Sequence, residues 1–103
     1  MDNSTLHPLI QQTEIVRETR YRFAGVPTII GRIIVIKRND IVVSYAWEIN
    51  YYCRLSDQFD VYRPSRQVEE SLNGAEFRLQ DYAMRFENAV DWKINERFGT
   101  LND

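Results

Sequence analysis

Residues 28–53 have the sequence TIIGRIIVIKRNDIVVSYAWEINYYC, two runs rich in isoleucine, valine and aromatic residues on either side of Asn39 and Asp40. Such runs are typical of β-strands. Asn and Asp also tolerate the positive φ angles that a two-residue hairpin turn requires. The sequence therefore predicts an antiparallel hairpin made of strands 28–38 and 41–53.

A two-residue turn also predicts how the two strands pair, starting with Arg38 opposite Ile41. One face then carries the pairs Ile36 with Val43, Ile34 with Tyr45, Arg32 with Trp47 and Ile30 with Ile49. The other face carries Val35 with Ser44, Ile33 with Ala46 and Gly31 with Glu48, and its small side chains would let a helix approach closely. A three-residue turn would move every side chain to the opposite face, so the register depends on the turn.

The residues before the hairpin alternate between apolar and charged side chains over 14–23, which predicts a third strand. Pro8 is a good first-turn residue and favours a short helix over residues 6–12. The helix and the strand can coexist.

From about residue 65 onward, good helix formers replace the β-branched residues. Ser65 is a candidate N-cap for a short helix over 65–72. Asn73, with Glu76 three positions later, is a candidate N-cap for a long helix over 74–98 that stops at Gly99. One stripe at helical spacing contains Val68, Leu72, Ala75, Leu79, Tyr82, Ala83, Phe86, Ala89, Val90 and Ile94.

These elements predict an α+β fold in a single domain, residues 1–103. It consists of an antiparallel sheet of about three strands (14–23, 28–38 and 41–53), a short helix (65–72) and a long amphipathic helix (74–98) that packs across the sheet. The chain has 103 residues, of which 44% are hydrophobic, with 13 basic and 15 acidic side chains and a net charge of -2. This composition excludes an intrinsically disordered chain.

The sequence predicts a cytoplasmic protein without membrane association. Its longest aliphatic run, residues 33–36, is too short to span a bilayer. The first residues contain no cationic region followed by an apolar stretch, so a secretory signal is not expected. The single cysteine, Cys53, cannot form an intrachain disulfide and is expected to be a buried small hydrophobe.

No pattern of residues predicts catalysis, a metal site or a cofactor. The single histidine, His7, offers no zinc-binding spacing to Cys53, and the sequence lacks phosphate-binding glycine loops and hydrolase motifs. Asp57 and Asp60 lie in a predicted loop, but nothing around them indicates separated pKa values, so we interpret them as solvated charges. No catalytic residue is predicted, and an enzyme is the less favoured class.

An excess of apolar surface predicts self-association. A helix over 74–98 would be about 37 Å long and would cover one sheet face, whereas both faces of the hairpin carry apolar groups. Phe77, Met84 and Trp92 lie off the helix stripe and would stay exposed. We therefore expect a homodimeric, non-enzymatic interaction protein of the adaptor or inhibitor type, which can also bind a protein partner. The contact would use the aromatic sheet face or the long helix, with Arg32, Trp47, Phe77, Met84 and Trp92 as candidate interface residues.

Two other function classes stay open. The first is a small-molecule-binding domain, or an enzyme of unidentified type, with a pocket between sheet and helix. Its candidate lining residues are Tyr45, Trp47, Tyr82 and Phe86, with Glu48 as the polar anchor. The second is a single-stranded nucleic-acid binder, which the negative net charge disfavours. Its candidate residues are Arg20, Arg22, Arg32, Arg38, Tyr45 and Trp47.

Overall fold

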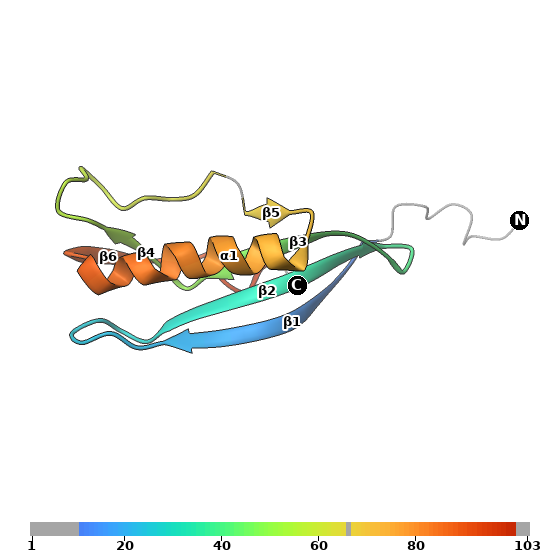
Figure 1. Ribbon diagram of the computed structural model, residues 1–103, viewed down its shortest axis with the longest axis horizontal. Helices are drawn as coiled ribbons and strands as arrows, with labels where there is room; N and C mark the ends of the chain where they lie inside the picture. The colour runs from blue at the N-terminus through green and yellow to red at the C-terminus, as the bar shows by residue number, and fades with distance from the viewer. Residues whose placement is uncertain (1–10, 66, 101–103) are drawn as a thin grey trace, which may run out of the picture.

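The computed structural model describes residues 11–65 and 67–100. Its main sheet has the strand order β1-β2-β3-β5, and a second sheet pairs β4 with β6. The elements are β1 (Gln11–Tyr21), β2 (Ile29–Arg38), β3 (Ile41–Ile49), β4 (Tyr51–Arg54), β5 (Val68–Glu69), α1 (Leu72–Ala83), the 3₁₀ helix η2 (Met84–Asn88) and β6 (Asp91–Ile94). Helix α1 lies along one face of the main sheet (Figure 1). The α+β class is therefore confirmed, with four strands in the main sheet instead of three.

The β2–β3 hairpin closes with the predicted two-residue turn. Asn39 and Asp40 have φ angles of 52° and 67°, and Arg38 pairs with Ile41. Positive φ at both central residues is the geometry of a type I′ turn, whose twist matches that of the two strands. The turn chemistry of Asn39 and Asp40 thus determines where the hairpin folds back.

A β-bulge in β3 makes the predicted register wrong beyond the first two pairs. Lys37 pairs with Val42, but Ile36 pairs with Ser44, so Val43 is an extra residue in β3. Such a residue shifts all later pairs by one position. The observed pairs are Val35 with Tyr45, Ile34 with Ala46, Ile33 with Trp47, Arg32 with Glu48 and Gly31 with Ile49.

The core lies between the main sheet and α1. Its buried members are Ile29, Ile33, Trp47, Ile49, Cys53, Ala75, Leu79, Tyr82, Ala83 and Phe86. Helix and sheet are in close contact at Gly31, where an added Cβ atom would lie 2.6 Å from Leu79 Cδ1. The predicted close approach of a helix at this glycine is therefore present.

Replacement of Gly31 by alanine is expected to destabilise the fold by about 1–3 kcal/mol, because the new methyl group overlaps Leu79. Leu79→Ala alone is expected to cost about 2–5 kcal/mol, because it leaves a cavity. In the double variant the two changes compensate each other, so its loss of stability should be smaller than the sum of the single losses. Urea unfolding of the three variants measures this coupling, and strictly additive losses would contradict the contact.

The predicted strand 41–53 is interrupted at Asn50. The Asn50 side chain accepts a hydrogen bond from the Ile30 N–H (2.8 Å) and donates one to the Thr28 carbonyl (3.1 Å). The Asn50 side chain therefore binds main-chain groups at the start of β2 and just before it, at the point where β3 ends. The following residues, Tyr51–Arg54, leave the main sheet and pair with β6.

The predicted helix over 65–72 is wrong. Val68 and Glu69 instead form β5, which pairs with Ala46 and Tyr45. Helix α1 begins at Leu72, and its N-cap is Ser71 rather than Ser65 or Asn73: Ser71 Oγ accepts a hydrogen bond from the Gly74 N–H at 3.0 Å.

The predicted helix over 74–98 is too long. The chain tightens into η2 after Ala83, and Ala89 is already extended, with φ -71° and ψ 138°. Residues 91–94 then pair with β4, with Trp92 opposite Cys53. Pairing with a distant strand here outweighs the local helix propensity. The alternative helix was predicted over residues 6–12. Residues 6–10 lie outside the described residues, and Gln11 and Gln12 belong to β1.

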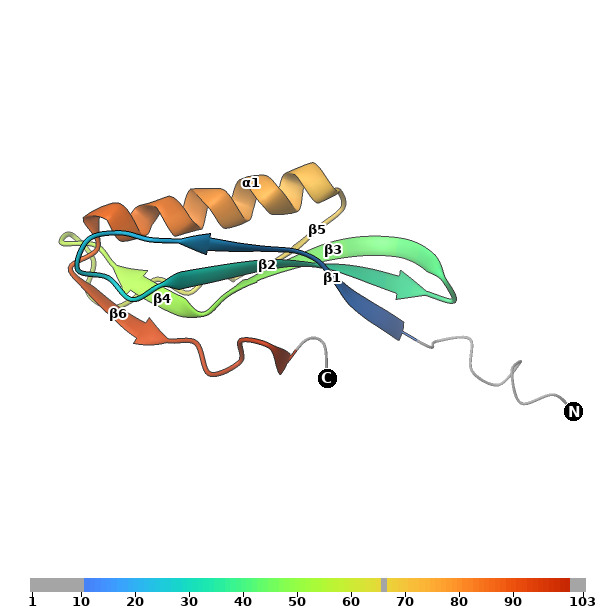
Figure 2. The same cartoon turned by 90° about the horizontal axis from the view of Figure 1, so that it is seen from below.

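The two faces of the main sheet are covered by different parts of the chain. Helix α1 lies on one face, and the segment after β6 runs along the other (Figure 2). This segment, residues 95–100, covers part of the face that sequence analysis expected a second copy of the chain to cover. Within residues 11–65 and 67–100, no helix has the length and apolar character needed to cross a membrane.

Candidate functional site

The five predicted ligand-binding residues do not line one pocket between sheet and helix. Trp47, Tyr82 and Phe86 are packed together in the core, with ring centroids 6.1 Å apart in each neighbouring pair. Tyr45 packs at the edge of the same cluster. Glu48 follows Trp47 in β3, so its side chain points to the opposite face, away from α1.

The five predicted interface residues are also dispersed. Trp47 is only 2% exposed, because the bulge in β3 turns its side chain toward α1, where it forms part of the core. Arg32 and Trp92 are partly buried. Phe77 and Met84 on the helical segment are 66% and 45% exposed, so only these two present an accessible apolar surface.

The arginine and aromatic residues of the nucleic-acid hypothesis lie on different faces of the sheet. Tyr45 and Trp47 face the core around α1. Arg32 belongs to the other face, where it contacts Glu18 and Glu48. The structure therefore does not assemble the predicted basic and aromatic surface.

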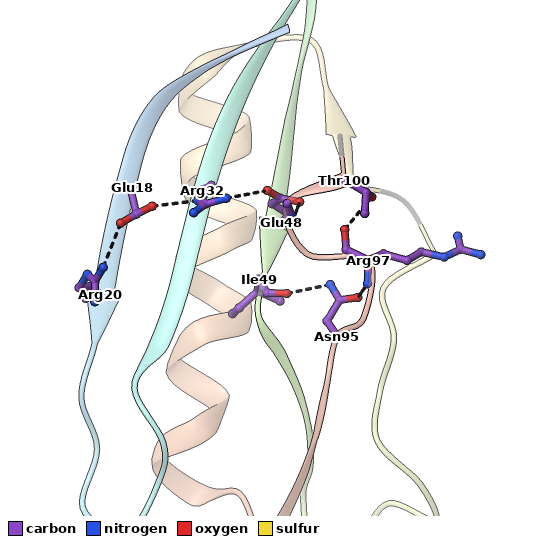
Figure 3. A network of polar contacts seen from close by, with 9 residues as sticks. Glu18, Arg20, Arg32, Glu48, Ile49, Asn95, Arg97 and Thr100 are labelled. Carbon is purple, nitrogen blue, oxygen red and sulfur yellow. Dashed lines mark hydrogen bonds and ion pairs between the residues drawn. The ribbon is translucent and has the colours of Figure 1, made fainter. Parts of the chain in front are cut away.

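Four charged side chains form an alternating row across the face opposite α1 (Figure 3). Arg20 Nη2 lies 3.5 Å from Glu18 Oε2, and Arg32 Nε lies 2.8 Å from Glu18 Oε1. Arg32 Nη1 lies 3.9 Å from Glu48 Oε2. We call these residues, Arg20, Glu18, Arg32 and Glu48, the charge row. Glu18 pairs with Arg32 in the β1–β2 register, and the bulge in β3 makes Glu48 the partner of Arg32 on the other side.

Glu48 is the buried end of the charge row. It is 3% exposed, and its Oε1 atom accepts a hydrogen bond from the Gly99 N–H at 3.0 Å. The Arg32 guanidinium also lies over the ring of Phe98, 4.5 Å from the ring centroid. A buried carboxylate stays ionised only beside a compensating cation, and Arg32 is a cation beside Glu48. At the exposed end, the hydrogen bond from Arg32 lowers the pKa of Glu18.

The segment after β6 is anchored to the bend between β3 and β4. Asn95 Nδ2 donates a hydrogen bond to the Ile49 carbonyl at 2.8 Å, and the Asn95 N–H donates one to the Asn50 carbonyl at 2.8 Å. Asn95 Oδ1 in turn accepts a hydrogen bond from the Arg97 N–H. A groove of about 1100 Å³ lies beside this segment. Two of the predicted ligand-binding residues, Trp47 and Glu48, belong to its lining, together with apolar residues (Ile36, Ala46, Val68 and Ile94) and charged ones (Arg63, Lys93, Glu96 and Arg97).

The two loop carboxylates have different surroundings. Asp60 lies 3.2 Å from Lys93 Nζ and 3.9 Å from Arg63 Nη1. Its pKa is lowered, first by the Val61 N–H and then by Lys93. Asp57 is exposed. The part of the chain that the structure describes contains no group of three His, Cys, Asp or Glu side chains suited to hold a metal ion.

The edge of the main sheet formed by β1 is a feature that sequence analysis missed. β1 is the outermost strand of the described sheet. Val16 is an extra residue in it, because Ile15 pairs with Ile34 whereas Arg17 pairs with Ile33. Ile15 and Val16 are 41% and 45% exposed. An imperfect alternation of side chains over 14–23 is the only signal of this bulge in the sequence.

The sheet also projects beyond α1 at its hairpin end (Figures 1 and 2). There Ile41, Val42 and Val43 are 68%, 45% and 49% exposed. β5 pairs only with Tyr45 and Ala46 of β3, so it does not cover this end. The described residues thus leave an apolar surface around the end of the hairpin and the edge of β1.

Comparison with known proteins assigns no family to this arrangement. No protein family model, no curated protein and no solved structure matches the chain. Its function therefore has to follow from the exposure, charge and contacts of its own residues.

Proposed function

We propose that this chain is a protein-interaction domain that acts as a homodimer, in which the β1 strands of two copies pair edge to edge. The main-chain groups along an edge strand can bind another strand. In the described sheet, β1 has a neighbour on one side only. Antiparallel pairing of two β1 strands would join the two main sheets into one.

The observation that carries the proposal is the self-complementary charge pattern of β1. If two copies pair around Ile15 and Val16, Glu14 of each copy lies opposite Arg17 of the other. In the same register no like charges face each other, since Glu18 lies opposite Thr13 and Arg20 opposite Gln11. Opposite charges in such cross-strand positions are favourable, and like charges are unfavourable.

The bulge at Val16 places the two complementary charges on the same face. Glu14 pairs with Val35 and Arg17 pairs with Ile33, and these two β2 residues share one face of the sheet. Without the extra residue, side chains three positions apart would point to opposite faces. The ion pair of Arg17 with Glu76 on α1 places the Arg17 side chain on the helix-facing side.

Two other surfaces considered from the sequence are less suited to a dimer contact. The aromatic sheet face is covered by α1 of the same chain. The helix presents Phe77 and Met84 as isolated exposed apolar residues, with charged Glu76 and Arg78 as neighbours of Phe77. The helix surface around Phe77 and Met84 is therefore the alternative dimer contact, and the experiment has to distinguish it from the β1 edge.

The test is sedimentation equilibrium of the wild-type chain and of charge variants of β1. The wild type is expected to have twice the mass of the 12.3 kDa chain. Glu14→Arg and Arg17→Glu should each weaken the dimer about tenfold, because each replaces two attractive pairs by two repulsive ones. The double variant, Glu14→Arg with Arg17→Glu, restores opposite charges and should dimerise like the wild type.

The matched control changes the helix surface, with Phe77→Ser and Met84→Ser in one variant. This variant is expected to dimerise normally. A wild-type chain that stays monomeric at all concentrations would overturn the proposal. So would a charge-swapped double variant no better than the single variants, or a dimer lost only in the helix variant.

A further inference from the structure

Three isoleucines form an apolar strip on the face of the main sheet opposite α1, at the end that carries the β2–β3 turn. Ile15 and Ile41 are 41% and 68% exposed, and Ile36 is partly buried in β2, the strand between them. Ile15 pairs with Ile34, and Ile41 pairs with Arg38. Positions 34, 36 and 38 point away from α1, because they alternate along β2 with the residues of the core. We call Ile15, Ile36 and Ile41 the apolar strip.

The segment after β6 covers the neighbouring part of this face and ends beside the strip. Thr100, at its end, lines the same groove as Ile36. The turn end of the β2–β3 hairpin extends beyond this segment (Figure 2). Exposed apolar side chains that lie next to each other mark a surface that binds another group.

The chain enters β1 directly beside the strip (Figure 2). Gln11 pairs with Arg38, which pairs on its other side with Ile41. Neighbouring strands lie about 4.8 Å apart, so about 10 Å separates the main chains of Gln11 and Ile41. Gln12 Oε1 accepts a hydrogen bond from the Asp40 N–H at 3.1 Å, which holds the start of β1 against the turn. The residues before Gln11 are therefore tethered within reach of the strip.

Ten residues precede Gln11, and all of them lie outside the described residues. Their sequence, MDNSTLHPLI, contains Leu6, Leu9 and Ile10 close to the point of attachment. A tight turn uses four residues, which leaves six that can extend over about 20 Å at roughly 3.3 Å per residue. The strip spans positions 34–38 of β2, or about 13 Å by the same measure. The segment is therefore long enough to fold back over the strip.

We propose that residues 1–10 fold back onto the apolar strip of their own chain, with Leu6 and Leu9 against Ile36 and Ile41. The tether gives the segment a local concentration on the order of millimolar, so a contact too weak for separate molecules forms within one chain. The segment thereby shields the strip from other copies. Residues 101–103 fit the strip less well, because Leu101 is their single apolar residue. The contact lies within one chain, so it is independent of the proposed dimer.

The test is paramagnetic relaxation in the full chain, with a nitroxide attached through Ser4→Cys. The single native cysteine, Cys53, is 1% exposed and is therefore not labelled. The amide signals of Ile36 and Ile41 are expected to be lost by broadening. That of Phe77, an exposed residue of α1 on the other side of the sheet, should stay sharp.

Two mixed samples distinguish a contact within one chain from a contact between copies. In the first, the ¹⁵N-labelled chain carries the nitroxide and is diluted with an excess of unlabelled chain without it, and the broadening should persist. In the second, the ¹⁵N-labelled chain lacks the nitroxide and is mixed with unlabelled chain that carries it, and the strip signals should stay sharp.

Variants identify the two sides of the contact. Leu6→Ser with Leu9→Ser removes apolar surface from the segment and should weaken its binding at least about tenfold, so that the strip signals sharpen. Ile41→Ser should have the same effect from the side of the sheet. The matched control is Val42→Ser, which changes the next exposed residue. Val42 pairs with Lys37 and points to the opposite face, so the broadening should remain.

Three results would overturn the proposal. The first is that the signals of Ile36 and Ile41 stay as sharp as that of Phe77. The second is that Val42→Ser releases the segment as fully as Ile41→Ser. The third is that the broadening occurs only in the second mixed sample, which would assign the strip to a second copy of the chain.

Discussion

Replacement of Arg32 by methionine is expected to lower the free energy of unfolding by about 3 kcal/mol. The Glu48 side chain is 4% exposed, and removal of the cationic partner of a buried carboxylate is strongly destabilising. Methionine keeps most of the side-chain volume, so the loss arises from the charge and not from a cavity. Chemical unfolding in urea at neutral pH measures the effect.

A second substitution tests whether the negative charge of Glu48 is the cause of the lost stability. Adding Glu48→Gln to Arg32→Met removes the charge and keeps an oxygen that can accept the hydrogen bond of the Gly99 N–H. The double variant should recover more than half of the lost stability. Arg20→Met, at the exposed end of the charge row, is the control and should cost less than about 1 kcal/mol. A double variant as unstable as Arg32→Met would show that Arg32 acts by packing against Phe98 instead.

Replacement of Tyr82 by phenylalanine is expected to cost about 2–4 kcal/mol, because it removes a hydroxyl that serves two main-chain groups. Tyr82 Oη accepts a hydrogen bond from the Cys53 N–H at 3.0 Å and donates one to the Tyr62 carbonyl at 2.5 Å. The hydroxyl thereby joins α1 to β4 and to the loop before β5. Tyr62→Phe makes the same chemical change on the ring stacked against Tyr82, and it should leave stability within about 0.5 kcal/mol of the wild type.

The same hydroxyl makes stability depend on alkaline pH. Burial raises the pKa of Tyr82 above its ordinary value of 10.0. The folded state therefore favours the neutral phenol more than the unfolded state does. This contribution is complete below pH 10 and is lost as the pH rises toward the folded-state pKa. Melting temperatures from pH 8 to 11 should thus fall less steeply above pH 10 in Tyr82→Phe than in the wild type, and equal slopes would contradict this role.

The parts of the fold that local chemistry determines are the parts that the sequence predicts. Asn39 and Asp40 form the expected turn because their side chains tolerate positive φ, whatever the rest of the chain does. The apolar spacing of Ala75, Leu79 and Tyr82 places these residues against the sheet as expected. The fold class followed from these two elements.

The missed parts depend on residues far apart in the chain. Nothing local marks Val43 as an extra residue, yet this bulge decides that Trp47 faces α1 and that Glu48 lies beside Arg32. Residues 91–94 have acceptable helix propensity, and they form β6 only because β4 offers an unpaired edge. The candidate site was predicted least well. Its residues were grouped by the expected strand register, and a single extra residue changes that register.

The split of one long strand at Asn50 has a consequence for folding during synthesis. The hairpin leaves the ribosome early, but the partner of β4 follows about 37 residues later, which is roughly 2–7 s at 5–20 residues per second. During that interval the Tyr51–Arg54 edge has no strand to pair with, and Cys53 has not yet been enclosed. The nascent chain is therefore most exposed to thiol oxidation and to strand exchange in this interval, before the second sheet closes.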